Sequence, residues 1–163
     1  IGQGLSNTVI FEIQADSRRN KWLGIHGGGL NRISVDEVSI LYISSADGLK
    51  DDKVWSLALQ NDSVLWVGCN SGLSKVELTG KKLDRIKAIS NFDKRDGLKG
   101  IDIFKGSTFI DKNNRAWWGT GKGLVYKDLE TNEDDTMAPL VYLDQIQLDG
   151  QKVDFRFPQR LSF

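Results

Sequence analysis

A sequence motif that recurs three times constrains this chain more than any other feature. Each copy opens with a Gly-Leu pair, continues through an apolar run and a polar turn, and reaches a Trp-x-Gly triplet and a second Gly-Leu pair. Equivalent tryptophans at 22, 66 and 117 are 44 and 51 residues apart, close to the roughly 40–50 residues of a propeller blade. The repeat positions are Gly4, Trp22, Gly24, Gly48, Trp66, Gly68, Gly97, Trp117 and Gly119.

The third copy is longer than the other two in one interval. From the opening glycine to the tryptophan the spacing is 18 residues in copy one (4 to 22) and in copy two (48 to 66), but 20 in copy three (97 to 117). Such agreement between the first two copies indicates a structural repeat. The third copy is a looser match to the same pattern.

The apolar runs inside each copy have the length and composition of strands. They are short, rich in Val, Ile, Leu and Trp, and bounded by Gly, Asn, Asp and Ser, which is strand and turn chemistry. No amphipathic stretch of helical length competes with this pattern. The sequence predicts four strands in each of the first two copies and three in the third: 8–15, 21–25, 30–34 and 40–43; 54–60, 64–69, 73–78 and 85–89; 107–111, 116–120 and 124–128.

Paired bulky residues in the Trp-x-Gly triplets predict that both faces of these strands are covered. Adjacent residues on a strand point to opposite faces. In each triplet the tryptophan and the residue after it are both large and apolar, so both faces carry a bulky apolar side chain: Trp22-Leu23, Trp66-Val67 and Trp117-Trp118. A sandwich strand would alternate with polar residues, whereas blades stacked around an axis bury both faces of their inner strands. We therefore expect an all-β fold, a partial β-propeller of about three four-stranded antiparallel blades, with the recurring tryptophans in its core.

The three copies resemble the propeller repeat of two-component regulators, which has a Gly-Leu start, an Asp/Asn-Gly turn, Trp-x-Gly-Thr and Gly-Gly-Leu. The turns depart from that pattern, with Arg19-Asn20, Asp62-Ser63 and Asn113-Asn114 in place of Asp-Gly, although Asn and Asp tolerate the same backbone conformations. The segment 138–152 resembles the opening of the immunoglobulin-like triple-tyrosine domain that follows such propellers. The expected domains are a partial propeller at 1–129 with blades near 4–47, 48–96 and 97–129, an acidic linker at 130–137, and the start of the immunoglobulin-like domain at 138–163.

By this resemblance the chain would be a periplasmic, ligand-sensing part of a hybrid histidine kinase. It would respond to an oligosaccharide or another nutrient and relay the signal to a membrane-linked kinase. The alternative is a structural scaffold or protein-interaction module, with the ligand held by other blades of the parent. Three blades cannot close a ring, so exposed strand edges and apolar faces also predict self-association of the chain or contact with the remaining blades.

Composition argues against several other function classes. The 22 basic and 22 acidic residues leave no net charge to attract nucleic acid, and no apolar stretch approaches the roughly 20 residues of a membrane helix. His26 is the sole histidine and Cys69 the sole cysteine, which excludes a His cluster for a metal and an internal disulfide. We expect no enzyme activity, metal or cofactor. Because the chain begins at Ile1, we interpret it as a piece whose targeting and membrane segments lie outside it.

The topology of a four-stranded meander predicts where a ligand would bind. The connections between blades lie on the same face as the turns between second and third strands, and we call this the connection face. Its side chains differ from copy to copy, as a recognition surface requires, and the candidate ligand contacts are His26, Asp51, Asn70 and Lys122. Trp55, aligned with Ile10, and Trp118, aligned with Leu23 and Val67, are interpreted as core residues and not as sugar-stacking platforms.

Overall fold

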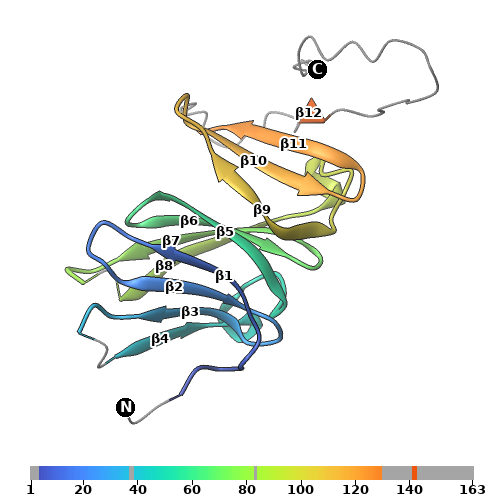
Figure 1. Cartoon of the computed structure of the whole chain (residues 1–163). Helices are drawn as coiled ribbons and strands as arrows, with labels where there is room; N and C mark the ends of the chain where they lie inside the picture. The colour runs from blue at the N-terminus through green and yellow to red at the C-terminus, as the bar shows by residue number, and fades with distance from the viewer. Residues whose placement is uncertain (1–3, 37–38, 83, 130–140, 143–163) are drawn as a thin grey trace, which may run out of the picture.

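Three four-stranded antiparallel sheets follow one another along the chain (Figure 1). The structure is a computed structural model and describes residues 4–36, 39–82, 84–129 and 141–142. Each sheet is a meander in which consecutive strands pair. The first strands of the three sheets contact one another, as the innermost strands of a propeller do. The prediction of an all-β partial propeller is therefore confirmed.

The strands of the first two blades agree closely with the predicted ranges. Blade 1 comprises β1 (Ile10–Ala15), β2 (Lys21–Ile25), β3 (Gly29–Ile33) and β4 (Ile40–Ile43). Blade 2 comprises β5 (Val54–Asn61), β6 (Val64–Cys69), β7 (Gly72–Thr79) and β8 (Arg85–Phe92). Blade 3 comprises β9 (Ile103–Ile110), β10 (Arg115–Thr120), β11 (Gly123–Asp128) and β12 (Val141–Tyr142).

The prediction that the third copy lacks its fourth strand is wrong. The strand Val141–Tyr142 pairs antiparallel with Val125 and Tyr126 of β11 and takes the fourth position in the sheet. An unpaired strand edge can be paired by any extended segment that reaches it, and here the segment lacks the spacing of the repeat. The rest of the stretch 138–163, which resembles an immunoglobulin-like domain, and the predicted linker 130–137 lie outside the described residues.

The Gly-Leu pairs end short turns in the connections between blades. In both described connections a capping box closes a 3-10 turn, the glycine takes a left-handed conformation that favours glycine, and the leucine is buried. Burial of a leucine side chain stabilises the fold by roughly 1.5–3 kcal/mol. The two turns are η1 (Ser45–Asp47) with Gly48 (φ 105°) and Leu49, and η2 (Lys94–Asp96) with Gly97 (φ 87°) and Leu98.

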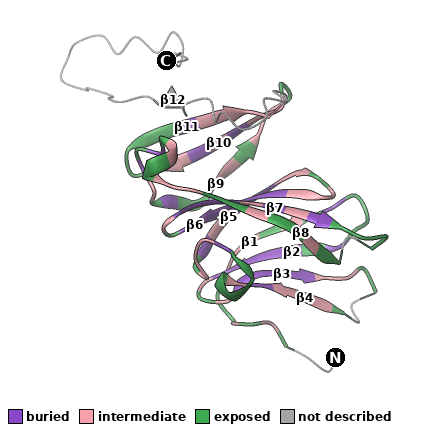
Figure 2. Cartoon of the chain, turned by 180° about the vertical axis from the view of Figure 1, so that it is seen from behind, coloured by how far each residue is buried: buried purple, intermediate pink, exposed green. Residues whose placement is uncertain are grey.

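In the first two blades the tryptophan of the repeat faces the blade that follows. Trp22 belongs to a core cluster with Val54 and Leu57 of blade 2, and Trp66 lies edge-to-face with Trp118 of blade 3, 5.3 Å between ring centres. Trp117 occupies the equivalent position in blade 3, where no further blade is described, and it is only half-buried. Burial therefore differs between the strands. Figure 2 shows that buried residues are concentrated in the middle strands of blades 1 and 2.

The glycine of each Trp-x-Gly triplet makes room for the first strand of the next blade. A Cβ atom on Gly24 would lie 2.8 Å from Cγ1 of Val54, and one on Gly68 would lie 2.6 Å from Cγ2 of Ile103. At Gly119 the nearest atom belongs to the same blade and lies 3.0 Å away. At Gly68 the hydroxyl of Ser56, in the same blade, would also clash with a Cβ atom, so both the next blade and the strand's own neighbour favour glycine there.

In each blade a side chain at the end of the first strand accepts a hydrogen bond from the indole N–H of that blade's repeat tryptophan. The Asp16 carboxylate also accepts hydrogen bonds from turn amides, and Asp111 does the same in blade 3. This arrangement couples the shape of the hairpin turn to the orientation of the tryptophan. The indole bonds are Trp22 Nε1 to Asp16 (3.3 Å), Trp66 Nε1 to Gln60 (3.0 Å) and Trp117 Nε1 to Asp111 (2.9 Å), and the amide donors are those of Arg18, Asn20, Asn113 and Arg115.

One hairpin turn does not follow the expectation that Asn or Asp replaces glycine. In blade 3 the left-handed residue is Asn114 (φ 55°), as expected. In blade 1 it is Arg19 (φ 67°), the residue before Asn20. The bonds from the turn amides to Asp16 hold this less favourable conformation in place.

We predict that Gly68→Ala destabilises the chain by about 1–3 kcal/mol, since overpacking a filled core costs that much. The matched substitution Gly119→Ala should cost less than Gly68→Ala, because its Cβ atom would approach only Ser107 of the same blade, at 3.0 Å. Urea unfolding followed by tryptophan fluorescence measures both. Equal costs at the two glycines would contradict the role assigned to inter-blade packing.

Candidate functional site

Three of the four residues predicted to contact a ligand meet at the seam between blades 1 and 2. The backbone of His26 pairs with that of Lys53 across the seam. The amide of Asn70 donates to the Lys53 carbonyl (3.0 Å), and the Asp51 carboxylate accepts from the Lys53 amide (2.8 Å). Lys122 lies one blade further, where its amide donates to a threonine hydroxyl of its own blade. The structure therefore brings His26, Asp51 and Asn70 together on the connection face.

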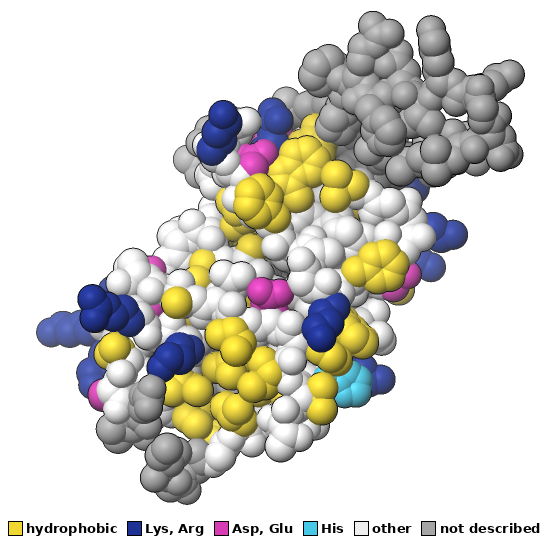
Figure 3. All heavy atoms as spheres, in the orientation of Figure 1, with side chains coloured by type: hydrophobic (Ala, Val, Ile, Leu, Met, Phe, Trp, Pro, Cys, Tyr) yellow, Lys and Arg dark blue, Asp and Glu magenta, His cyan; other side chains and the backbone are white. Residues whose placement is uncertain are grey.

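His26 also belongs to an aromatic cluster at this seam. The rings of Phe11 and Trp55 stack with their centres 4.7 Å apart and their planes 9° from parallel. His26 packs edge-on against both, 5.4 Å from Phe11 and 5.7 Å from Trp55. The Lys105 ammonium lies 4.7 Å from the centre of the Phe11 ring, within cation–π range. We call Phe11, His26, Trp55 and Lys105 the axial cluster; Figure 3 shows the histidine beside hydrophobic and basic side chains.

The alignment of Trp55 with Ile10 is wrong, and for this reason the sequence does not lead to the axial cluster. In β1 and β5 a one-residue β-bulge follows the first paired residue, and the bulged positions are Phe11 and Trp55. Trp55 is therefore equivalent to Phe11 and not to Ile10, which corrects the alignment. Phe104 follows the first residue of β9 in the same way and is 55% exposed. Bulges re-aim side chains and are common next to functional sites.

The two extra residues in the third copy lie in an enlarged bulge of β9. Between two paired positions, four residues of β9 stand opposite one residue of β10, and Gly106 within them has φ 63°. The Ser107 hydroxyl closes the bulge by donating to the Phe104 carbonyl (2.6 Å). This bulge carries Lys105 to Phe11 of β1. The spacing of 20 residues was therefore a visible sequence signal for this part of the site.

The acidic side chains of the connection face already accept hydrogen bonds that stabilise turns. Asp52 accepts hydrogen bonds from the amide (2.7 Å) and hydroxyl (2.9 Å) of Ser45. Asp93 caps η2, and hydrogen bonds from Arg95 and then Lys50 hold the pKa of this carboxyl well below its usual range. An ionised, capped aspartate is not suited to general acid catalysis.

The neighbouring thiol is equally unsuited to chemistry. Burial raises the pKa of the Cys69 thiol to about 12, and its side chain is fully buried. A buried neutral thiol is neither a nucleophile nor a good metal ligand. Within residues 4–36, 39–82 and 84–129, no cluster of three or more His, Cys, Asp or Glu side chains could hold a metal ion. The axial cluster offers contacts for binding: ring faces, an imidazole and an ammonium group.

Comparison with known proteins places the fold among extracellular domains of bacterial signalling systems. No family model matches the chain. Histidine kinase P4 of Formosa agariphila is 31% identical over 132 residues, which is 78% of this chain but 9% of that protein. The chain therefore spans a small part of its curated relative.

Solved structures share the fold at lower identity. A structure described as the extracellular domain of a hybrid two component system, BT3049 of B. thetaiotaomicron, matches with TM-score 0.61 at 20% identity, covering 77% of this chain and 16% of that one. The extracellular domain of BT4673 from the same organism, described as a one component system, matches with TM-score 0.64 at 16% identity, covering 88% and 20%. The resemblance drawn from the repeat is confirmed at the level of the fold. Among the described residues, no helix has the length and apolar character to cross a bilayer.

We predict that Cys69 does not react with a thiol reagent such as DTNB at pH 8 while the chain is folded, and reacts fully in denaturing urea. The unfolded thiol loses its proton near its ordinary pKa of 9.0, whereas the folded thiol keeps it until about 12. The folded state therefore binds the extra proton between these values, and stability should fall as the pH rises above 9. Rapid labelling of the native chain would contradict this burial.

Proposed function

We propose that this chain is a periplasmic, ligand-sensing part of a two-component signalling protein. The observation that carries the proposal is the stack of blades built on the repeat, which has the fold of extracellular domains of two-component systems. The 31% identity to a histidine kinase supports the same assignment. The parent would pass the signal to a membrane-linked kinase.

The axial cluster is the proposed centre of ligand recognition. Its residues come from the first strands of all three blades and from the turn after β2. Half-buried ring faces of Phe11 and Trp55 offer apolar area, and His26 and Lys105 add polar and charged groups. Small-molecule sites commonly combine aromatic walls with a few polar groups. An oligosaccharide presents both kinds of surface and is the ligand class we propose, with Asp51, Asn70 and Lys122 as further contacts on the connection face.

A ligand in this place would touch all three blades at once. Binding can shift an equilibrium only through different contacts in its two states. A ligand held between β1, β5 and β9 would favour one relative arrangement of the blades, and this preference is what a sensing region must transmit. The role is binding, and we propose no catalytic step and no cofactor.

A structural scaffold is the second candidate function. It is favoured by the use of Asp51, Asp52 and Asp93 within the turns of the connection face, since carboxylates with internal partners contribute less to a ligand. In this case the ligand would be bound by other blades of the parent, and the present chain would supply the coupling surface.

We also propose that the chain self-associates through its two open faces. Phe109, which is 63% exposed, pairs with Trp117 on the face that would meet a following blade. Ile13, which is 58% exposed, occupies the position at which Leu57 of blade 2 contacts blade 1. Association should grow with concentration in light scattering and weaken in Phe109→Ser. A chain that stays monomeric at high concentration would contradict this proposal.

The function test uses oligosaccharides derived from laminarin, xylan and alginate as probes. Each probe is titrated, by calorimetry, onto the chain and onto the longer protein that contains it. Lys105→Ala, an exposed residue of the axial cluster, is expected to weaken binding at least tenfold. Trp55→Phe should weaken it to a smaller extent. The matched control is Lys112→Ala, an exposed lysine in the β9–β10 turn.

Three outcomes separate the candidates. Binding that is weakened by Lys105→Ala and not by Lys112→Ala supports the sensing role. Probes that bind the longer protein with the same affinity in both variants identify the chain as scaffold. If no probe binds either protein, the oligosaccharide assignment is wrong.

A further inference from the structure

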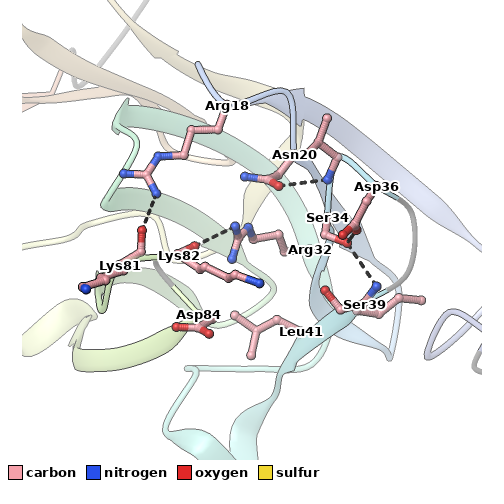
Figure 4. A pocket seen from close by; sticks show the side chains of 12 residues that line it. Arg18, Asn20, Arg32, Ser34, Asp36, Ser39, Leu41, Lys81, Lys82 and Asp84 are labelled. Atoms are coloured by element: carbon pink, nitrogen blue, oxygen red, sulfur yellow. Dashed lines mark hydrogen bonds between the residues drawn. The ribbon is translucent and has the colours of Figure 1, made fainter.

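A cavity opens on the opposite face of the same seam. This face carries the turns between first and second strands and between third and fourth strands, and we call it the hairpin face. The cavity has a volume of about 570 Å³, within the roughly 300–1,000 Å³ of small-molecule sites. Figure 4 shows that its walls come from the β1–β2 turn, β3, the β3–β4 turn and β4 of blade 1, and from the β7–β8 turn of blade 2.

Two arginines of blade 1 fix the cavity wall to blade 2. Arg18 Nη1 donates to the Lys81 carbonyl (3.0 Å), and Arg32 Nη2 donates to the Lys82 carbonyl (2.9 Å). The Arg32 guanidinium also lies 5.6 Å from the centre of the Trp22 ring. These bonds run from one blade to the other, so the cationic groups are held in place before any ligand arrives. Preorganised groups lose less entropy on binding.

The described lining carries more positive than negative charge. Its basic residues are Arg18, Arg32, Lys81 and Lys82, and its acidic residues are Asp36 and Asp84. The Asp36 carboxylate accepts a hydrogen bond from the Ser34 hydroxyl. The chain as a whole is neutral, so the positive charge is a local property of this wall. Asp62, outside this lining, lies 3.9 Å from Arg18 Nε and offsets part of that charge. The remaining like charges repel each other, and a bound anion relieves that repulsion.

The remaining wall is apolar. Val35, which is 55% exposed, lies in this wall with Ile40 and Leu41. An inorganic ion would leave these side chains in water, whereas a molecule with an uncharged body covers them. Arginine suits planar carboxylates and sulfate groups because its N–H donors form a fixed fork.

We infer that this cavity is a second binding site, for a small organic acid that carries a carboxylate or sulfate group on an uncharged body. The acidic group would face Arg18, Lys81 and Lys82, and the body would cover Val35, Ile40 and Leu41. The site lies on the opposite face from the axial cluster. A failure of the proposed sensing function would therefore not contradict this second site, and the converse also holds.

The test titrates the chain with glucuronate, with glucose and with sodium sulfate, and follows backbone amide shifts by NMR. Glucuronate and glucose differ in one carboxylate, so the pair isolates the contribution of charge. We expect glucuronate to shift amides at Arg18, Asn20 and Lys81, and to bind at least tenfold more tightly than sulfate. Glucose should cause no shift there, and added salt should weaken glucuronate binding.

The variant Lys81→Gln/Lys82→Gln removes two charges and keeps the backbone carbonyls that bind the arginines. It should weaken glucuronate binding at least tenfold. The control Lys87→Gln/Lys112→Gln removes two exposed lysines outside the cavity and should leave the affinity unchanged.

Four results would overturn the inference. These are equal binding of glucose and glucuronate, binding of sulfate that is as tight as that of glucuronate, shifts that map outside the cavity, and equal losses in the two double variants.

Discussion

The close approach of one blade's first strand to the Trp-x-Gly strand of the blade before it is the contact on which the rest of the structure depends. The missing side chain at Gly24 lets Val54 reach the strand, and Trp22 then packs against the same blade. The absence of a Cβ thereby allows large apolar side chains on both blades to interlock, which is the dense packing that stabilises protein interiors. A repeat with one glycine and one tryptophan at fixed spacing is enough to define such a seam. Both candidate binding regions lie at the ends of the first seam.

The β-bulges explain why the side chains of the axial cluster accumulate at one end of that seam. A regular first strand would alternate its side chains between the two covered faces. The extra residue at Phe11 and at Trp55 breaks this alternation, so an aromatic ring leaves the packed face and meets its neighbour from the next blade. Blade 3 has a larger β-bulge at the same position, and this bulge brings Lys105 to the first blade. Packing therefore determines the regular parts of each blade, and the departures from regular pairing expose the side chains that we propose bind a ligand.

The features that could be predicted from the sequence are those enforced in every copy. Strand order, the buried tryptophans of the first two blades and the connection face all follow from a spacing that packing keeps fixed. The equivalence of Trp55 and Phe11 was visible in the 44-residue spacing of the first two copies and was lost by matching apolar character instead. Their stacking could not be predicted, because it depends on a β-bulge that re-aims both side chains. The β12 strand was missed for a different reason: strand pairing satisfies backbone groups and needs no repeat pattern. The basic cavity combines Arg18 and Arg32 with a turn 50 to 63 residues later, a proximity that only the fold creates.

The two candidate binding regions are joined by one packed layer. Phe11 and Trp55 face each other across the first seam on the connection face, and Arg18 and Arg32 cross it on the hairpin face. Between them lies the cluster around Trp22, in which the side chains of both blades are fully buried. Packed cores transmit strain because they have few voids to absorb it. This core is the route by which a ligand that changes the separation of the blades on one face would act on the other face, and any such coupling is reciprocal, since linkage makes each ligand alter the affinity of the other by the same factor.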